Sequence, residues 1–301
     1  MKVKDIRLDE AWKHFVEIKL PEEKGGKNEK LRWEKHIEPY FNDCYLSEIT
    51  TFKIDVFSRN LKNKKLSPQS VKHVLSLLRR TMRQMSKWEL YSGPIPIFNM
   101  PRFDNEATRF LTPEEARILI EELYQSSSSW LGDFATLALN TGCRAGELFK
   151  LNKGCVDKNE KLLHIKDTKN SKNRFVPLNK TAYEVVEAYM QEDAYYFFLK
   201  GVGPQKNQIP PIFRRTVSHL GFNSGITDSR HRVVFHTLRH TCASWMVQKG
   251  VSLVVVSKIL GHSSLKITMR YAHLAPEQSL AAVKAVEDRF QETTPSKKHK
   301  C

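Results

Sequence analysis

The chain has 301 residues, with 49 lysines and arginines against 33 aspartates and glutamates, so its formal net charge at pH 7 is +16. This excess attracts polyanions and accelerates encounter with nucleic acid. Five scattered cysteines without paired spacing argue against a disulfide-rich secreted protein, and neither a signal-peptide pattern nor a long apolar run suggests export or a membrane span. We therefore expect a cytoplasmic protein with two domains and a nucleic-acid partner.

Residues 1–92 predict a helical domain. Apolar residues recur at helical spacing in three stretches, 8–18, 29–41 and 46–60. A longer helix is expected from Ser67 and Pro68, since serine caps a helix and proline suits its first turn. Its apolar stripe consists of Val71, Val74, Leu75, Leu78, Met82 and Met85. Its basic residues either bind nucleic acid or form an ordinary solvated face, and they are Lys72, Arg79, Arg80 and Arg83.

Residues 93–110 predict an interdomain linker, because a glycine and three prolines interrupt any helix there. A second domain is expected over 111–276, opening with a capped helix at Thr112. Residues 157–177 alternate between apolar and polar types, which predicts a small antiparallel sheet among helices. The fold class is therefore mainly α with a small β-sheet (α+β).

Residues 277–301 predict a C-terminal helix followed by a basic tail. The helix would present apolar residues at roughly helical spacing, namely Leu280, Val283, Val286 and Phe290. This face either packs on its own domain or docks on a neighbouring copy of the chain.

Four segments carry residues suited to phosphoryl transfer: T-G-C-R-A-G-E-L (141–148), T-K-N-S-K-N-R-F-V-P-L (168–178), H-T-L-R-H-T (236–241) and L-G-H (260–262). Tyr271 follows the last of them by nine residues. A phosphodiester gains negative charge during nucleophilic attack, so fixed cations must meet its non-bridging oxygens, and arginine forks do this best. A tyrosine oxygen becomes a nucleophile when positive charge stabilises its anion and a neighbour accepts its proton.

These segments, in this order, resemble the tyrosine recombinases of the phage integrase family from about Leu111 to Pro276. The resemblance implies a helical core-binding domain before a mostly helical catalytic domain. It also implies site-specific DNA strand exchange through a 3′-phosphotyrosine intermediate and a four-way junction, without ATP, metal or another cofactor. The implied catalytic residues are Arg144, Lys169, His236, Arg239, His262 and Tyr271, supported by Glu147 and His240.

The resemblance also implies the role of each residue. Tyr271 is the nucleophile, and His236 helps to manage its proton. The non-bridging oxygens are held by Arg144, Arg239 and His262. Lys169 protonates the departing 5′ hydroxyl, with Lys172 as its rival for that role. His240 is expected to pack within its helix rather than to act in catalysis.

The implied partners are double-stranded DNA with specific target sites, further copies of the chain in a tetramer on DNA, and directionality factors, with no membrane. In the hairpin, Lys172 and Arg174 are further candidates for DNA binding. An N-terminal arm-binding domain of the kind that many integrases carry would be absent or trimmed.

Three alternatives compete with this interpretation. A zinc site at His236 and His240 is disfavoured, because Thr237 stands where a zinc protease needs glutamate. A type IB topoisomerase would share the chemistry but rejoin the same strands. A non-catalytic DNA-binding regulator would retain the charge while losing catalytic residues. Within the recombinases, the sequence leaves a Xer-type resolvase and a simple integrase both open.

Overall fold

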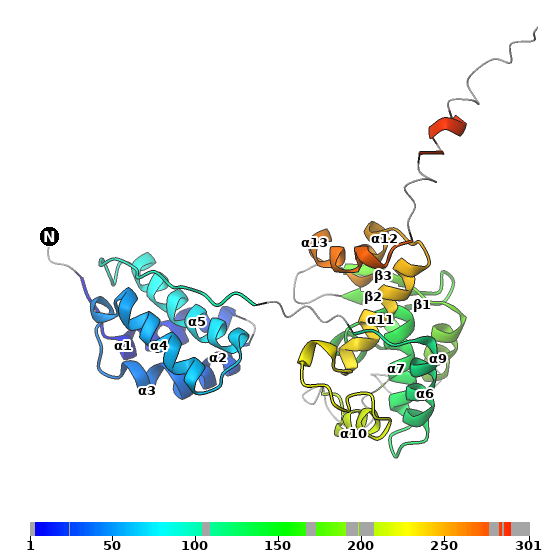
Figure 1. Ribbon diagram of the computed structural model, residues 1–301, viewed down its shortest axis with the longest axis horizontal. Helices are drawn as coiled ribbons and strands as arrows, with labels where there is room; N and C mark the ends of the chain where they lie inside the picture. Colours follow the sequence, from blue (N-terminus) through cyan, green and yellow to red (C-terminus); the bar gives the residue numbers. More distant parts are fainter. Residues whose placement is uncertain are drawn as a thin grey trace, which may run out of the picture. The chain divides into compact units, whose positions relative to one another are not determined.

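The computed structural model describes residues 4–23, 25–103, 109–166, 173–190, 198, 208–276, 283–284 and 286–289. The chain divides into two compact units, Met1–Asn105 and Glu106–Cys301, each with a core of its own (Figure 1). The division falls inside the segment that the sequence predicts as a linker.

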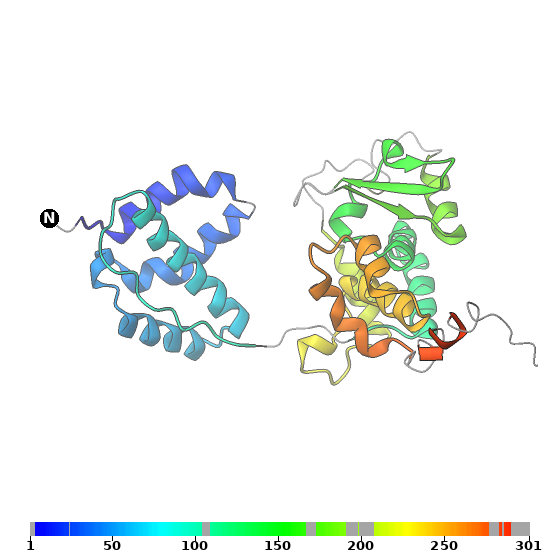
Figure 2. The ribbon, with the colours of Figure 1, turned by 90° about the horizontal axis from the view of Figure 1, so that it is seen from above.

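The first unit is a bundle of helices (Figure 2). Its α-helices are α1 (Leu8–His14), α2 (Gly26–Arg32), α3 (Glu38–Phe41), α4 (Thr51–Asn63) and α5 (Pro68–Lys87). Single π-helical turns continue α1 over Phe15–Lys19 and join α2 to α3 over Trp33–Ile37, so the predicted helices 8–18 and 29–41 are present with local changes of pitch.

Helix α5 is the central element of the first core. The Ser67 hydroxyl caps it by accepting the Ser70 backbone N–H at 3.2 Å, as the sequence predicts. All six residues of the predicted stripe are buried, together with Leu77 and Thr81. The stripe packs with aromatic residues of the earlier helices, among them Trp33, Phe41 and Phe57.

An extended segment after α5 packs on this same unit. Phe98 is buried in the first core, and Ile95 and Met100 pack against it. The Ile97 backbone N–H donates to Thr51 Oγ1 at 3.0 Å, and the Asn99 side chain donates to Asp55. The early part of the predicted linker is therefore an extended strap of the first unit, because proline excludes a helix but not extended packing.

The second unit combines helices with a small sheet. Its helices are α6 (Pro113–Tyr124), α7 (Trp130–Thr141), α8 (Ala145–Leu148), α9 (Lys180–Met190), α10 (Pro211–His219), α11 (Phe235–Gln248), α12 (Leu253–Leu260) and α13 (Leu265–Thr268). The strands β1 (Val156–Asp157), β2 (Leu162–Lys166) and β3 (Asn173–Pro177) form an antiparallel sheet in the order β1-β2-β3. This agrees with the predicted fold class.

Helix α7 is the centre of the second unit. It packs against α6, α9 and α11, and most of its residues are buried (Figure 1). The sheet attaches to this core through Leu163 and Val176, which face each other across β2 and β3. Helix α11 is tied to the start of α6, where the Leu111 backbone N–H donates to Thr241 Oγ1 at 2.9 Å.

A second, smaller cluster fixes the end of this unit. Ala243 and Val247 of α11 pack with Val256 and Leu260 of α12 and with Tyr271. Tyr271 lies in the 3-10 turn Met269–Leu274, which follows α13. The cluster therefore anchors the turn that carries the tyrosine against the helices that carry the other candidate residues.

Little of the predicted C-terminal helix is described. Residues 283–284 and 286–289 are helical, and Val283 and Val286 are exposed, whereas Leu280 and Phe290 lie outside the described residues. Among the helices that are described, none combines the length and apolar character needed to cross a bilayer.

Candidate active site

Arg144 stands at the N-terminus of α8. Gly142, with φ of 64°, ends α7 in the left-handed region and turns the chain toward it. The Arg144 backbone N–H donates to Glu147 Oε2 at 2.7 Å, and its Nη1 donates to Oε1 at 2.9 Å. Since the Arg144 side chain is still 41% exposed, Glu147 holds the guanidinium at the surface, where an anion can reach it.

Glu147 is shared between two arginines. Arg174 of β3 donates from Nη1 to Oε1 at 2.9 Å and from Nη2 to Oε2 at 2.8 Å, a bidentate pair. Burial alone would raise the pKa of Glu147, but the hydrogen bonds and charge of Arg174, with help from Arg144, lower it to about 2. The carboxylate is therefore ionised at neutral pH.

Arg174, which the sequence predicts as a DNA contact, binds groups of the protein in this structure. Its side chain is only 9% exposed, and besides Glu147 it donates from Nε to the Ile259 carbonyl at 2.9 Å. Its guanidinium is thus held by protein groups, and a role in DNA binding stays a prediction.

Arg239 lies inside the unit, on α11. Its side chain is buried, and it donates from Nη1 to the Gly142 carbonyl at 2.5 Å and from Nη2 to the Leu260 carbonyl at 2.8 Å. Burial and the nearby charge of Arg144 lower its pKa to about 10, which leaves it protonated at neutral pH. Arg239 thus joins the end of α7 to the end of α12 while remaining a cation.

His236 and His262 lie near these arginines. Burial, followed by the charges of Arg239 and Arg144, lowers the pKa of each histidine to about 4, so both are neutral at pH 7. His262 Nδ1 is 2.7 Å from Thr268 Oγ1. When the Thr268 hydroxyl donates to Nδ1, the opposite ring nitrogen carries the proton and becomes a donor for an anion.

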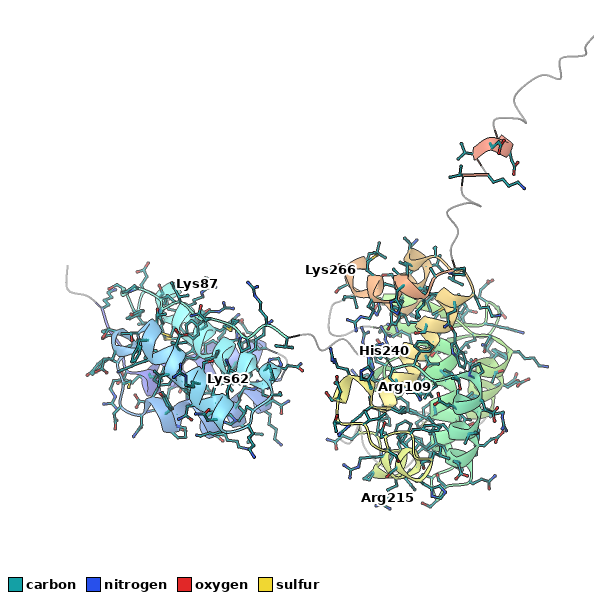
Figure 3. All side chains as sticks on the ribbon, viewed as in Figure 1. Lys62, Lys87, Arg109, Arg215, His240 and Lys266 are labelled. Atoms are coloured by element: carbon teal, nitrogen blue, oxygen red, sulfur yellow. The ribbon has the colours of Figure 1, made fainter. Side chains whose placement is uncertain are left out.

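Tyr271 is buried, and its hydroxyl lies 2.6 Å from Nδ1 of His240. Burial, together with the His236 ring and the Arg270 charge, lowers the pKa of His240 to about 3. A neutral His240 can therefore accept a hydrogen bond from the phenol hydroxyl at Nδ1. Figure 3 labels this histidine on α11.

The expected roles of the two histidines differ from this geometry. His240, expected only to pack, makes the hydrogen bond to Tyr271, and the centroid of the His236 ring lies 4.8 Å from that of His240. Nothing in the H-T-L-R-H-T segment distinguishes the two, because both lie one helical turn apart on the same face of α11.

Lys169 and Lys172 fall outside the described residues, so the role of each stays a prediction. The strands on either side are described, with Lys166 of β2 paired with Asn173 of β3.

The basic residues of α5 are in different surroundings. Lys72 and Arg83 are exposed, and the Lys72 ammonium lies 5.4 Å from the centroid of the Phe103 ring. Arg79 is half-buried, and Arg80 forms ion pairs with Glu23 and Glu29. Lys72 and Arg83 are therefore the better placed of the four to meet a ligand.

Taken together, the site offers an exposed guanidinium, a buried guanidinium, two neutral imidazoles and a phenol with a proton acceptor. Such an array can hold an oxyanion and bring a tyrosine oxygen to it. Within the described ranges, His, Cys, Asp and Glu side chains form no group of three or more that could hold a metal ion.

Comparison of the sequence with known proteins gives a consistent result. The sequence profile of the phage integrase family matches residues 109–278. The chain is 29% identical over 237 residues to the integrase of Salmonella phage P22, which covers 75% of the chain and 58% of that protein. It is 27% identical over 249 residues to a tyrosine recombinase of Pseudothermotoga lettingae, covering 80% and 84%. The chain thus spans less than two thirds of the length of the P22 integrase.

Solved structures of low sequence identity share the fold. An integrase of the Tn1549 transposon, in complex with a circular intermediate DNA, superposes with a TM-score of 0.68 at 18% identity, covering 93% of this chain and 98% of that one. A lambda integrase dimer bound to a COC′ core site gives a TM-score of 0.69 at 18% identity, covering 88% and 95%. The mainly helical fold with a small antiparallel sheet is therefore confirmed.

Proposed function

The chain belongs to the phage integrase family, and from this we propose that it is a tyrosine-type site-specific recombinase that cuts and rejoins double-stranded DNA. The observation that carries the proposal is the 2.6 Å contact between the Tyr271 hydroxyl and His240, in a unit where the buried Arg239 keeps its charge. A phenol beside a proton acceptor and fixed cations is what attack on a phosphodiester requires.

In the proposed cleavage step, the Tyr271 oxygen bonds to phosphorus and the bond from phosphorus to the 5′ oxygen breaks. The phenol proton passes to His240 Nδ1. The departing 5′ oxygen takes a proton from Lys169, the residue that the family resemblance assigns to this role. The product is a 3′-phosphotyrosine and a free 5′ hydroxyl.

The cations of the site stabilise the charge that develops in this step. Arg144 contacts the phosphate from the surface, and Arg239 contacts it from the interior of the unit. Arg239 can do so because its two hydrogen bonds to carbonyls use only part of its five N–H donors. His262 donates the N–H opposite Thr268. Removing a single donor of such a site typically costs about 100- to 1000-fold in rate.

Strand exchange follows from the same chemistry in reverse. The phosphotyrosine bond conserves the energy of the phosphodiester, so rejoining requires neither ATP nor a metal ion. The 5′ hydroxyl of a partner strand attacks it, and two such rounds, in a tetramer on DNA, pass through a four-way junction.

The test is formation of a covalent adduct. The purified protein is incubated with a pool of nicked duplexes randomised around the nick, and adducts are recovered on a denaturing gel and sequenced. We expect adducts with an enriched target sequence from the wild type and none from Tyr271→Phe. Tyr189→Phe is the matched control, because it removes another shielded hydroxyl, one that donates to Asp133 at 2.9 Å. An adduct that persists in Tyr271→Phe would place the nucleophile elsewhere.

A further inference from the structure

Arg174 connects three segments that are distant in sequence. It lies in β3, donates to Glu147 of α8 and donates to Ile259 at the end of α12. We propose that Arg174 is a positioning residue that assembles the two halves of the phosphate-binding site. The inference rests on the proposed recombinase function, and it assigns to Arg174 a role in the reaction without contact with DNA.

The first half of the site depends on Arg174 through Glu147. The two Glu147 oxygens accept both nitrogens of the Arg174 fork and also the backbone N–H and Nη1 of Arg144. Because the Arg174 side chain is only 9% exposed, its fork has little freedom and fixes the carboxylate plane. The direction of Arg144 is therefore set by a strand that does not carry it.

Arg174 also preserves the net charge of this half. Glu147 alone would form a neutral pair with Arg144, and its field would cancel much of the attraction of Arg144 for a phosphate. With Arg174 on the same carboxylate, two cations share one anion, and the group keeps a net positive charge.

The second half depends on Arg174 through the end of α12. Its Nε holds the Ile259 carbonyl, and the next carbonyl, that of Leu260, accepts Arg239. Gly261 follows with φ of 66°, and a Cβ there would lie 2.7 Å from Arg174 Cδ. The turn that leads to His262 is thus packed directly on the Arg174 side chain, which places Arg239 and His262 relative to Arg144.

The experiment measures single-turnover adduct formation on a nicked duplex recovered with the wild type. Rates are measured over a range of DNA concentrations, which separates the plateau rate from the half-saturating concentration. For Arg174→Lys we expect the plateau rate to fall by about 100-fold, since a small misplacement of catalytic groups is enough for that loss. The half-saturating concentration should change by less than about threefold, because DNA contacts of single residues affect binding and its salt dependence instead.

Arg117→Lys is the matched control. Arg117 also pairs with two carboxylates, Glu114 and Glu121, but on the exposed face of α6, and both constants should stay at wild-type values. A second readout is the pH profile. Loss of the Arg174 fork raises the pKa of Glu147. As the pH is lowered, the plateau rate of Arg174→Lys should therefore begin to fall at a higher pH than that of the wild type.

Two outcomes would overturn the inference. An unchanged plateau rate in Arg174→Lys would show that the fork positions nothing that the reaction uses. A higher half-saturating DNA concentration, with a shallower salt dependence and an unchanged plateau rate, would show that Arg174 contacts DNA. If the wild type forms no adduct, the proposed function itself fails, which is a separate result.

Folding is monitored by circular dichroism and thermal melting. Should Arg174→Lys fail to fold, the double variant Arg174→Gln with Glu147→Gln replaces it, because this pair leaves no unpaired charge buried. A wild-type plateau rate in that double variant overturns the inference equally.

Discussion

Replacing His240 by phenylalanine keeps a planar ring on α11 but removes the nitrogen that lies 2.6 Å from the Tyr271 hydroxyl. The matched change is His236→Phe, one helical turn earlier on the same helix, where the ring lies 4.8 Å from that of His240. The pair of variants asks which histidine handles the proton of the nucleophile.

The structure gives the size of both effects. A neutral hydrogen bond contributes roughly 1 kcal/mol net. His240→Phe should therefore lower the free energy of unfolding by about 1 kcal/mol. If His240 accepts the proton during attack, the rate of adduct formation should fall by about 100- to 10,000-fold as well. His236→Phe should affect the rate less.

Two assays separate these effects. A double-mutant cycle compares the free energies of unfolding in urea of the wild type, His240→Phe, Tyr271→Phe and the double variant. We expect a coupling energy of about 1 kcal/mol, because the two side chains share one hydrogen bond. Single-turnover adduct formation gives the rate for each histidine variant. A larger rate loss in His236→Phe than in His240→Phe would refute the assignment of the proton to His240. A coupling near zero would show that the hydrogen bond is not maintained in solution.

Two further predictions concern the turn at Gly261 and the protonation of the site. Gly261→Ala should lower the free energy of unfolding by about 1–2 kcal/mol for the left-handed backbone alone. It should also slow adduct formation, because the new Cβ displaces Arg174. Gly221 is the control: its φ is 70° and a Cβ there has its nearest neighbour at 3.5 Å, so Gly221→Ala should lower stability without slowing the reaction. The pKa values of His236 and His240 lie below their usual 6.5 in the folded state, so the unfolded chain binds more protons between about pH 6.5 and 4, and stability should fall as the pH falls through this window. The free energies of unfolding measured in urea at pH 7 and pH 5 should differ by about 1–2 kcal/mol for each histidine. The difference should be smaller in His240→Phe. Equal stability at the two pH values would contradict the burial of neutral imidazoles.

Local features of the fold were readable from the sequence, because short-range patterns determine them. The Ser67 cap, the buried stripe of α5 and the capped start of α6 at Thr112 all follow from spacing and residue type. The packing of the extended segment 94–100 could not be predicted, because prolines indicate the absence of a helix but not whether Phe98 packs in a core.

The contacts that organise the site could not be predicted from the sequence, for a related reason. The partners of Arg174 are 27 and 85 positions away, and His240 and Tyr271 are separated by 31. Such pairs are set by how α11, α12 and β3 pack, and their residue types fit several roles equally well. For this reason the sequence does not predict which groups Arg174 and His240 contact.

The two carbonyls that hold Arg239 belong to the C-terminal ends of two helices, Gly142 just beyond α7 and Leu260 at the end of α12. The aligned peptide dipoles of each helix place roughly half a negative charge at such an end. Arg239 is therefore stabilised in its buried position by fixed dipoles, and among the described residues no carboxylate forms an ion pair with it. In the proposed reaction, a phosphate would therefore reach Arg239 without first displacing a carboxylate, because the desolvation of the buried cation is already offset by these dipoles in the folded chain.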